Sequence, residues 1–209
     1  MGDLMEPQAA AEATLLPFHI GLLALLLLPI VIWREAIWNG IKTLKPRIKP
    51  LPAGLRMQDW VVWLSTWFGS GRLRPMPGTM GSLAAIPLGY YICAQGGPFL
   101  LATAALALFL VGTVAADRFG KKSGVADDQS IVVDEVVGMW IAAIPAENSW
   151  LMWMIAFFLF RLFDVYKPWP ASYYDNRSRN GYDTMMDDVV AGIYALPGVA
   201  AIALFIVKV

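Results

Sequence analysis

Two pairs of adjacent carboxylates stand where the surrounding sequence is apolar. Asp134 and Glu135 interrupt one apolar segment, and Asp187 and Asp188 stand directly before another. Charged side chains in such segments are costly unless a cation or water meets them. The positive end of a helix dipole readily explains one of Asp187 and Asp188, but explains both less well. The two pairs therefore indicate a shared role in binding a cation.

Two further aspartates, Asp127 and Asp164, extend this acidic group. Hard divalent cations such as Mg²⁺ prefer carboxylate and water oxygens as ligands. We therefore expect a magnesium site built from one set of carboxylates: Asp127, Asp134, Glu135, Asp164, Asp187 and Asp188.

Residues 69–82 are punctuated by glycine and lead into an apolar helix, for which Ser82 would be a good N-cap. Glycines let the backbone approach an anion closely, and a helix N-terminus offers free N–H groups, so the segment suits phosphate. Taken alone, a simple connecting loop is the more ordinary interpretation. Basic and hydroxyl side chains in this segment and further along the chain complete the candidate phosphate ligands: Arg72, Arg74, Thr79, Ser82, Arg161 and Lys167.

Arg161 and Asp164 lie three residues apart, on one face of a predicted helix. A plain ion pair explains this spacing as well as a binding function does. Lys167 is expected to end that helix, because Pro168 disfavours helical geometry at the residue before it. In metal-assisted phosphoryl transfer, basic side chains typically bind the phosphate oxygens while carboxylates bind the metal ion. The residues of this chain fit that pattern.

The remaining composition excludes several other classes of protein. A single cysteine, Cys93, excludes an intrachain disulfide, and it is not followed by the arginine of a cysteine phosphatase loop. A single histidine, His19, excludes a His-rich metal site and a two-histidine phosphatase mechanism. Sixteen basic residues balance sixteen acidic ones, so the net positive charge that would favour nucleic acid is absent.

The chain is too apolar for an ordinary soluble domain. Of its 209 residues, 58% are hydrophobic and 15% are charged, and the mean hydropathy is +0.57, whereas globular proteins carry about 25% charged residues. We predict an all-α, polytopic membrane protein with about six membrane helices. The expected helices cover residues 15–33, 82–94, 99–116, 131–144, 150–166 and 189–207, with turns at 95–98 and 145–149.

The cations predict the orientation of these helices, because Lys and Arg in short loops stay on the cytoplasmic side. With an external N-terminus, every Lys and Arg except Lys208 falls on that side. All the acidic and basic clusters then meet at one membrane face. Cation transport, a competing use of carboxylates inside a membrane, is disfavoured because no matching outer set continues a pathway.

A boundary is expected near residue 57. Residues 34–57 carry Pro46, Pro50 and Pro52 among basic residues, as in a linker lying along anionic headgroups. We therefore divide the chain into an extension, residues 1–57, with one spanning helix and a basic linker, and a catalytic domain, residues 58–209. The role of the extension is open between an anchor, a partner-binding segment and a regulator.

Four motifs in order resemble the bacterial phosphatidylglycerophosphatase A family over about residues 58–209. They are Gly78-Thr79-x-Gly81-Ser82 after a proline, Ile131-Val132-x-Asp134-Glu135-x-x-Gly138, Arg161-x-x-Asp164-x-x-Lys167-Pro168-x-Pro170, and Met186-x-Asp188-x-x-Ala191-Gly192. Each motif is short, but four in this order with similar spacing make chance a poor explanation.

The resemblance implies a Mg²⁺-dependent, all-helical enzyme of the bacterial inner membrane, and the distribution of Lys and Arg predicts that its active site is on the cytoplasmic side. Such an enzyme hydrolyses phosphatidylglycerophosphate to phosphatidylglycerol and phosphate. The residues themselves leave two mechanisms open, direct attack by water and a transient aspartyl-phosphate. Position by position, the resemblance points to residues 77–82 and to Asp127, Asp134, Glu135, Asp164, Lys167, Asp187 and Asp188. The expected catalytic residues are Asp134, Glu135, Asp164 and Asp188, although the motif leaves open which of them bind metal.

The sequence departs from the family pattern at two positions. Arg74 stands where a further proline is expected, and Asp128 adds an acid to the acidic loop, so substrate preference is in question. A non-catalytic membrane scaffold or a cation transporter remains the alternative function. The oligomeric state is left open.

Overall fold

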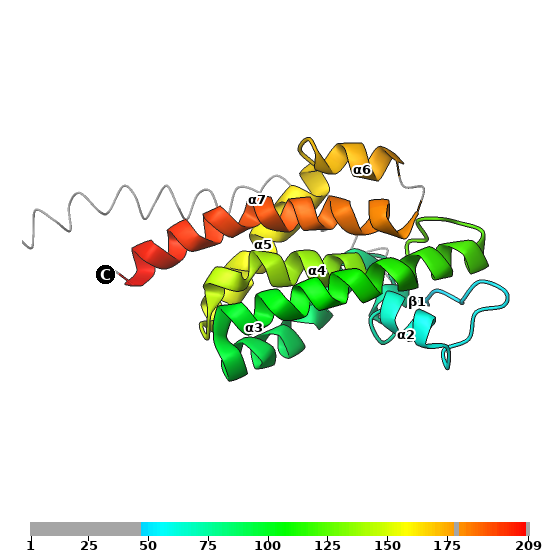
Figure 1. Ribbon diagram of the computed structural model, residues 1–209, viewed down its shortest axis with the longest axis horizontal. Coiled ribbons are helices and arrows are strands. Elements are labelled where there is room, and N and C mark those ends of the chain that lie inside the picture. The colour runs from blue at the N-terminus through cyan, green and yellow to red at the C-terminus, as the bar shows by residue number, and fades with distance from the viewer. Residues whose placement is uncertain (1–46, 178–179, 208–209) are drawn as a thin grey trace, which may run out of the picture. The chain divides into compact units, whose positions relative to one another are not determined.

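The computed structural model describes residues 47–177 and 180–207, so the predicted helix at residues 15–33 lies outside the described residues. Within the described part the chain is mostly helical, which confirms the all-α prediction (Figure 1). The described part also contains an antiparallel pair of short strands, each two residues long. The main elements are β1 (Arg47–Ile48), α2 (Trp60–Ser65), β2 (Leu73–Arg74), α3 (Pro77–Ser123), α4 (Val133–Ala142), α5 (Trp150–Tyr166), α6 (Ala171–Arg177) and α7 (Gly181–Val207), with short 3₁₀ turns at Ser70–Arg72 and Ile144–Ala146.

Helix α3 is a hairpin of two arms. Gly96 and Gly97 leave helical geometry, and Gly97 takes a positive φ of 68° that favours glycine. Figure 1 shows the chain reversing direction there. The break predicted at residues 95–98 is therefore confirmed, as is the turn before α5, where Ile144–Ala146 forms a 3₁₀ turn.

Three helices begin at other residues than the apolar runs predict. α3 begins at Pro77, whose fixed φ suits a first turn, so Ser82 lies inside the helix and is not its N-cap. α7 begins at Gly181, because the Asn180 side chain caps it by accepting hydrogen bonds from the backbone N–H groups of residues 182 and 183, both at 3.0 Å. Asp187 and Asp188 therefore lie beyond the first turn, and dipole capping explains neither.

Helix α4 also begins later than predicted, at Val133, which places Asp134 and Glu135 in its first turn. α4 has ten residues, and at about 1.5 Å per residue it covers about half of a ~30 Å hydrocarbon core. It packs between α3 and α7, which gives the described unit its central helix. The core around it contains Phe119, Val137 and Met185.

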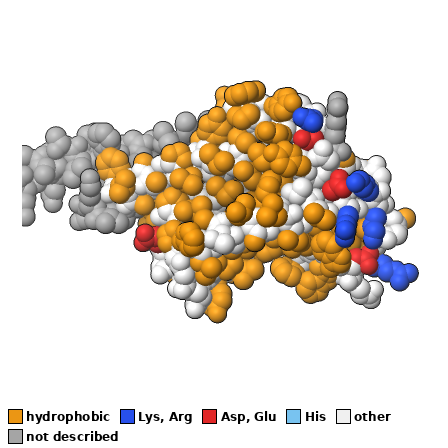
Figure 2. Space-filling view, viewed as in Figure 1, with side chains coloured by type: hydrophobic (Ala, Val, Ile, Leu, Met, Phe, Trp, Pro, Cys, Tyr) orange, Lys and Arg blue, Asp and Glu red, His pale blue; other side chains and the backbone are white. Residues whose placement is uncertain are grey.

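Two helices of the described residues are long and apolar enough to cross a membrane by length and composition, Pro77–Ser123 and Gly181–Phe205. Apolar side chains are exposed along both, including Phe99, Leu106 and Leu204. Figure 2 shows hydrophobic side chains over much of the visible face, with Lys and Arg gathered at one end. About six membrane helices therefore stays a prediction.

The compact unit begins at Pro46, before the boundary expected at residue 57. Residues 47 and 48 pair with β2, in the register Arg47 to Arg74. Leu55 is buried in the same core cluster as Phe119. Part of the predicted linker thus belongs structurally to this unit, while the functional division of the chain stays a prediction.

Candidate active site

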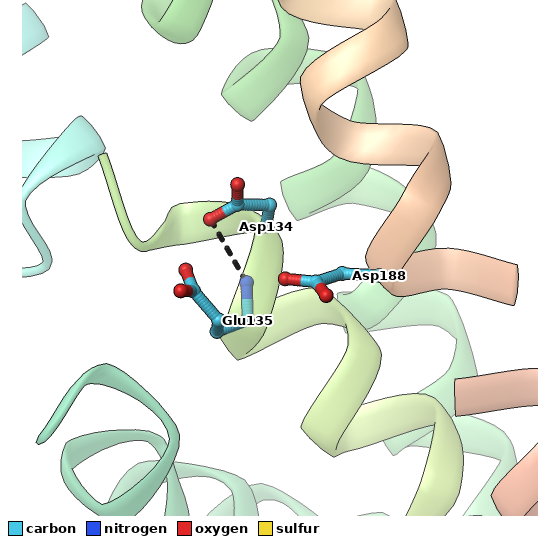
Figure 3. A group of neighbouring side chains, drawn as sticks. All are labelled: Asp134, Glu135 and Asp188. Carbon is cyan, nitrogen blue, oxygen red and sulfur yellow. Dashed lines mark hydrogen bonds between the residues drawn. The ribbon is translucent and has the colours of Figure 1, made fainter. Parts of the chain in front are cut away.

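Three carboxylates converge between α4 and α7. Asp134, Glu135 and Asp188 each place one oxygen within 4.8 Å of the others (Figure 3). The side chains of Asp134 and Asp188 are 7% and 3% exposed, so water reaches little of this cluster. Like charges at this separation and burial repel one another strongly unless a cation lies among them.

Close packing of two glycines brings these carboxylates together. Gly138 follows Asp134 by one turn of α4, and Gly192 follows Asp188 by one turn of α7. A Cβ added at Gly192 would lie 2.5 Å from the carbonyl oxygen of Gly138, and a Cβ added at Gly138 would lie 2.6 Å from the Asp188 carbonyl oxygen. The two helices therefore cross with their backbones in contact, as small residues allow.

One buried acceptor of the cluster has no hydrogen-bond partner among the described residues. Oε2 of Glu135 is buried and accepts no hydrogen bond from the described residues. The backbone N–H groups of Glu135 and Asp188 donate to the carboxylates that precede them, Asp134 and Asp187, both at 3.0 Å. A buried, unpaired carboxylate oxygen is costly, and an all-oxygen set with an unpaired member fits a hard cation.

A cavity of about 290 Å³ opens beside this cluster. All six carboxylates predicted for the metal site line it, together with two of the predicted phosphate ligands, Arg74 and Lys167. The remaining lining residues are Pro75, Pro77, Gln129 and Ile131. The structure thus brings into one cavity both the anionic groups and two of the cationic groups singled out in the sequence.

Arg161 lies beside the cavity and is held by two neighbours. Its Nη1 is 2.5 Å from Oδ2 of Asp164, so the predicted ion pair forms, and it donates a long 3.5 Å hydrogen bond to Oγ of Ser82. Ser82 is itself fully buried and donates to the carbonyl oxygen of Gly78 at 2.9 Å. Ser82 therefore contacts Arg161 from within α3.

Lys167 ends α5, as predicted, in a left-handed conformation with φ of 47°. Its Nζ contacts Asp187 at 2.8 Å and also contacts Asp175 of α6. Burial alone would lower the pKa of Lys167, but the carboxylates of Asp187 and Asp175 outweigh burial and hold that pKa above its ordinary value. The ammonium group is therefore charged throughout the physiological range.

Two predicted phosphate ligands lie elsewhere. Nε of Arg72 donates to the carbonyl oxygen of Lys49 at 3.0 Å. Thr79 is half-buried in the first turn of α3 and does not line the cavity.

The sequence does not single out Asp175, and it does not connect Asp128 of the acidic loop with Lys49, because no periodicity indicates either contact. Asp175 follows a proline-rich turn, and Lys49 is 79 residues from Asp128. Burial alone would raise the pKa of Asp128, but hydrogen bonds from Lys49 and Ser130 outweigh burial and lower it.

Comparison with known proteins identifies the family. The family model described as phosphatidylglycerophosphatase A matches residues 63–203. The chain belongs to this family. Phosphatidylglycerophosphatase A of Haemophilus influenzae is 46% identical over 143 residues, which cover 66% of this chain and 86% of that protein. Phosphatidylglycerophosphatase A of Escherichia coli is 39% identical over 155 residues, which cover 72% of this chain and 88% of that protein.

A third relative, from Bacteroides thetaiotaomicron, is provisionally named a phosphatidylinositol-3-phosphatase. It is 39% identical over 141 residues, which cover 64% of this chain and 87% of that protein. No solved structure matches the chain at a significant level. As a member of the phosphatidylglycerophosphatase A family the protein is a phosphatase, and every residue lining the cavity falls inside the matched region.

Substitution of Gly78 tests whether the packing around Glu135 is important for activity. A Cβ at this position would press against Oε1 of Glu135 and lie 3.2 Å from Nη1 of Arg161. Alanine favours a helix by roughly 0.5–1 kcal/mol over glycine, and the Glu135 carboxylate can swing aside, so Gly78→Ala should melt close to wild type. Displacing that carboxylate should lower phosphatase turnover by about 100-fold.

Melting curves and phosphate release measure the two effects. Gly198→Ala is the matched control, because its added Cβ would meet only Cδ1 of Leu159, at 3.2 Å and away from the cavity. Full activity in Gly78→Ala would show that the position of Glu135 does not matter.

Proposed function

We propose that this protein hydrolyses the phosphomonoester of phosphatidylglycerophosphate, releasing phosphatidylglycerol and inorganic phosphate. The observation that carries the proposal is the cavity in which six carboxylates meet Arg74 and Lys167. The names of the Haemophilus influenzae and Escherichia coli relatives support this substrate. Two helices are apolar enough to cross a membrane. A protein held in the membrane by these helices could bind the lipid phosphate in its cavity while the acyl chains of the lipid stay in the bilayer.

Basic side chains at the cavity would bind and orient the phosphate group of the lipid. Lys167 and Arg74 line the cavity and would pair with phosphate oxygens, while Arg161 stands next to Asp164. A water molecule attacks phosphorus as the bond to the glycerol oxygen breaks. The water passes a proton to a carboxylate, and the leaving oxygen takes up a proton to become the hydroxyl of phosphatidylglycerol. Attack by an aspartate followed by hydrolysis gives the same products.

The donor set fits Mg²⁺, and we infer that the enzyme depends on it. Asp134, Glu135 and Asp188 would hold the ion, with Glu135 Oε2 as an oxygen that no described residue hydrogen-bonds. Asp127, Asp164 and Asp187 line the same cavity as further candidates. When bound, the ion would offset the negative charge of the phosphate oxygens.

We further propose a multi-pass protein of the bacterial inner membrane with the cavity on the cytoplasmic side. Basic residues in the predicted loops support this orientation. Lys and Arg gather, together with acidic side chains, at one end of a visible face on which hydrophobic side chains predominate, as expected at a membrane interface (Figure 2). A cation transporter would not need Lys167 and Arg74 facing the same carboxylates, and a scaffold would not need a buried acidic cluster.

Substrate preference can be measured directly, because the third relative's name raises a second lipid headgroup. Phosphate release is compared for phosphatidylglycerophosphate, phosphatidic acid and phosphatidylinositol 3-phosphate in mixed micelles, and for soluble glycerol 3-phosphate. We expect phosphatidylglycerophosphate to give the highest kcat/KM. Faster turnover of the inositol lipid would reassign the headgroup, and an equal rate on the soluble ester would argue against a site built for a lipid.

A further inference from the structure

A partly buried ion pair joins the segment before α2 to the acidic loop of the cavity. Nζ of Lys49 lies 2.8 Å and 2.9 Å from the two carboxylate oxygens of Asp128. Asp128 is 7% exposed, and the Lys49 side chain is 30% exposed. A pair with this burial and two-oxygen geometry is far more constrained than a surface salt bridge.

The backbone of Lys49 is hydrogen-bonded to Arg72, the residue directly before β2. Its N–H donates to the carbonyl oxygen of Arg72 at 2.8 Å, and Nε of Arg72 donates back to the carbonyl oxygen of Lys49 at 3.0 Å. β2, which follows Arg72 directly, pairs with β1. Arg74, the last residue of β2, lines the cavity.

Asp128 in turn organises the acidic loop. Its Oδ1 accepts the backbone N–H of Ser130 at 2.8 Å, and its carbonyl oxygen accepts the N–H of Ile131 at 2.7 Å. The residues on either side of it, Asp127 and Gln129, both line the cavity. Lys49 therefore contacts both the loop that carries a cavity carboxylate and Arg72, the residue directly before the strand that carries a cavity cation.

We propose that Lys49 and Asp128 are positioning residues for the active site, setting the separation between two residues that line the cavity, Asp127 and Arg74. The proposal rests on the proposed function for its effect on turnover. Lys49 lies outside the matched region, residues 63–203, and Asp128 is one of the two departures from the family pattern. We call the Lys49–Asp128 ion pair the clamp. Because Lys49 belongs to the predicted extension, the clamp makes part of the extension a component of the site.

Hydrogen exchange of the full-length protein tests the clamp without reference to activity. Lys49→Met removes the charge and keeps the length of the side chain, and Lys49→Arg keeps a cation able to contact both oxygens. Lys49→Met combined with Asp128→Asn removes the clamp without leaving a buried charge unpaired, which protects the experiment against misfolding. We expect the amides of Ser130 and Ile131 to exchange faster in Lys49→Met and in the double variant, and at the wild-type rate in Lys49→Arg.

Steady-state kinetics on phosphatidylglycerophosphate provide the second readout. We expect kcat to fall by about 10- to 100-fold in Lys49→Met and in the double variant, as is typical when a supporting partner is lost. KM should change little, because the lipid-facing surface is untouched, and Lys49→Arg should restore most of kcat. Lys121→Met, which breaks the exposed pair with Asp117, is the matched control and should leave both measurements unchanged.

The outcomes separate this proposal from the proposed function. Unchanged exchange of the loop in both clamp-deficient variants overturns it, and so does faster exchange with unchanged kcat. A wild-type protein that hydrolyses no lipid phosphomonoester, but whose loop exchange depends on Lys49, overturns the proposed function and supports the clamp as the element that holds the loop.

Discussion

Replacement of Asp188 by Asn is expected to lower lipid phosphate hydrolysis by about 10²–10⁴-fold, because a transition-state charge interaction of several kcal/mol is lost. The same result is expected for Asp134→Asn and Glu135→Gln. Without metal, each variant should be as stable as wild type or more so, since neutralising one member of a cluster within 4.8 Å relieves repulsion. A carboxylate with a purely structural role would behave in the opposite way.

Melting curves with and without Mg²⁺, measured beside phosphate release, separate these cases. Mg²⁺ should stabilise wild type by about 2.7 kcal/mol at a hundredfold excess over its dissociation constant, and the variants should lose much of that gain. Asp117→Asn is the matched control, because Asp117 pairs with Lys121 on the surface of α3. A variant that melts early without metal and still hydrolyses lipid would remove its residue from the site.

Lys167→Met should produce the second large effect, on both stability and turnover. Lys167 pairs with Asp187, whose side chain is 12% exposed, and with Asp175. Removing one partner of a fully buried pair costs about 3–5 kcal/mol. Because the Lys167 side chain is 28% exposed, losing its charge-assisted hydrogen bond should cost less, about 1.5–3 kcal/mol. The free energy of unfolding should fall by that order, and turnover should fall because phosphate loses a cation.

Lys167→Arg and Asp175→Asn separate the two roles of this lysine. The first keeps the charge and should recover most of the stability, while the second should leave the pair with Asp187 intact. The raised pKa of Lys167 implies that its stabilising charge is fully present below the ordinary lysine value of about 10.4 and is lost only above it. A Lys167→Met protein as stable as wild type at neutral pH would contradict the pairing.

The sequence predicts the residue types of the site better than the edges of its helices. The Gly96-Gly97 break and the helix end at Lys167 depend on local backbone preferences, which can be read from glycine and proline. The early start of α7 depends on Asn180 as a cap, within a polar stretch that shows no apolar run. Local chemistry of this kind extends a helix beyond its hydrophobic segment.

Contacts between distant residues are the part that the sequence does not predict. The six acidic residues can be chosen by type, but their convergence depends on the crossing of Gly138 with Gly192, which joins two separate helices. The pair of Lys49 and Asp128 spans 79 residues and has no periodic signal. Nor does the sequence predict the hydrogen bond from Nε of Arg72 to the backbone of Lys49, and Arg72 as a phosphate ligand stays a prediction.

The central claim is that the carboxylate cavity hydrolyses a lipid phosphomonoester with the help of a divalent cation. The most direct measurement is the release of phosphate from phosphatidylglycerophosphate by the purified full-length protein, with the phosphatidylglycerol formed counted alongside, in Mg²⁺ and after chelation. We predict one phosphatidylglycerol for each phosphate in Mg²⁺, loss of both products on chelation, and recovery when Mg²⁺ is restored. Equal release after complete chelation would contradict the metal site, and no release under any of these conditions would contradict the proposed activity.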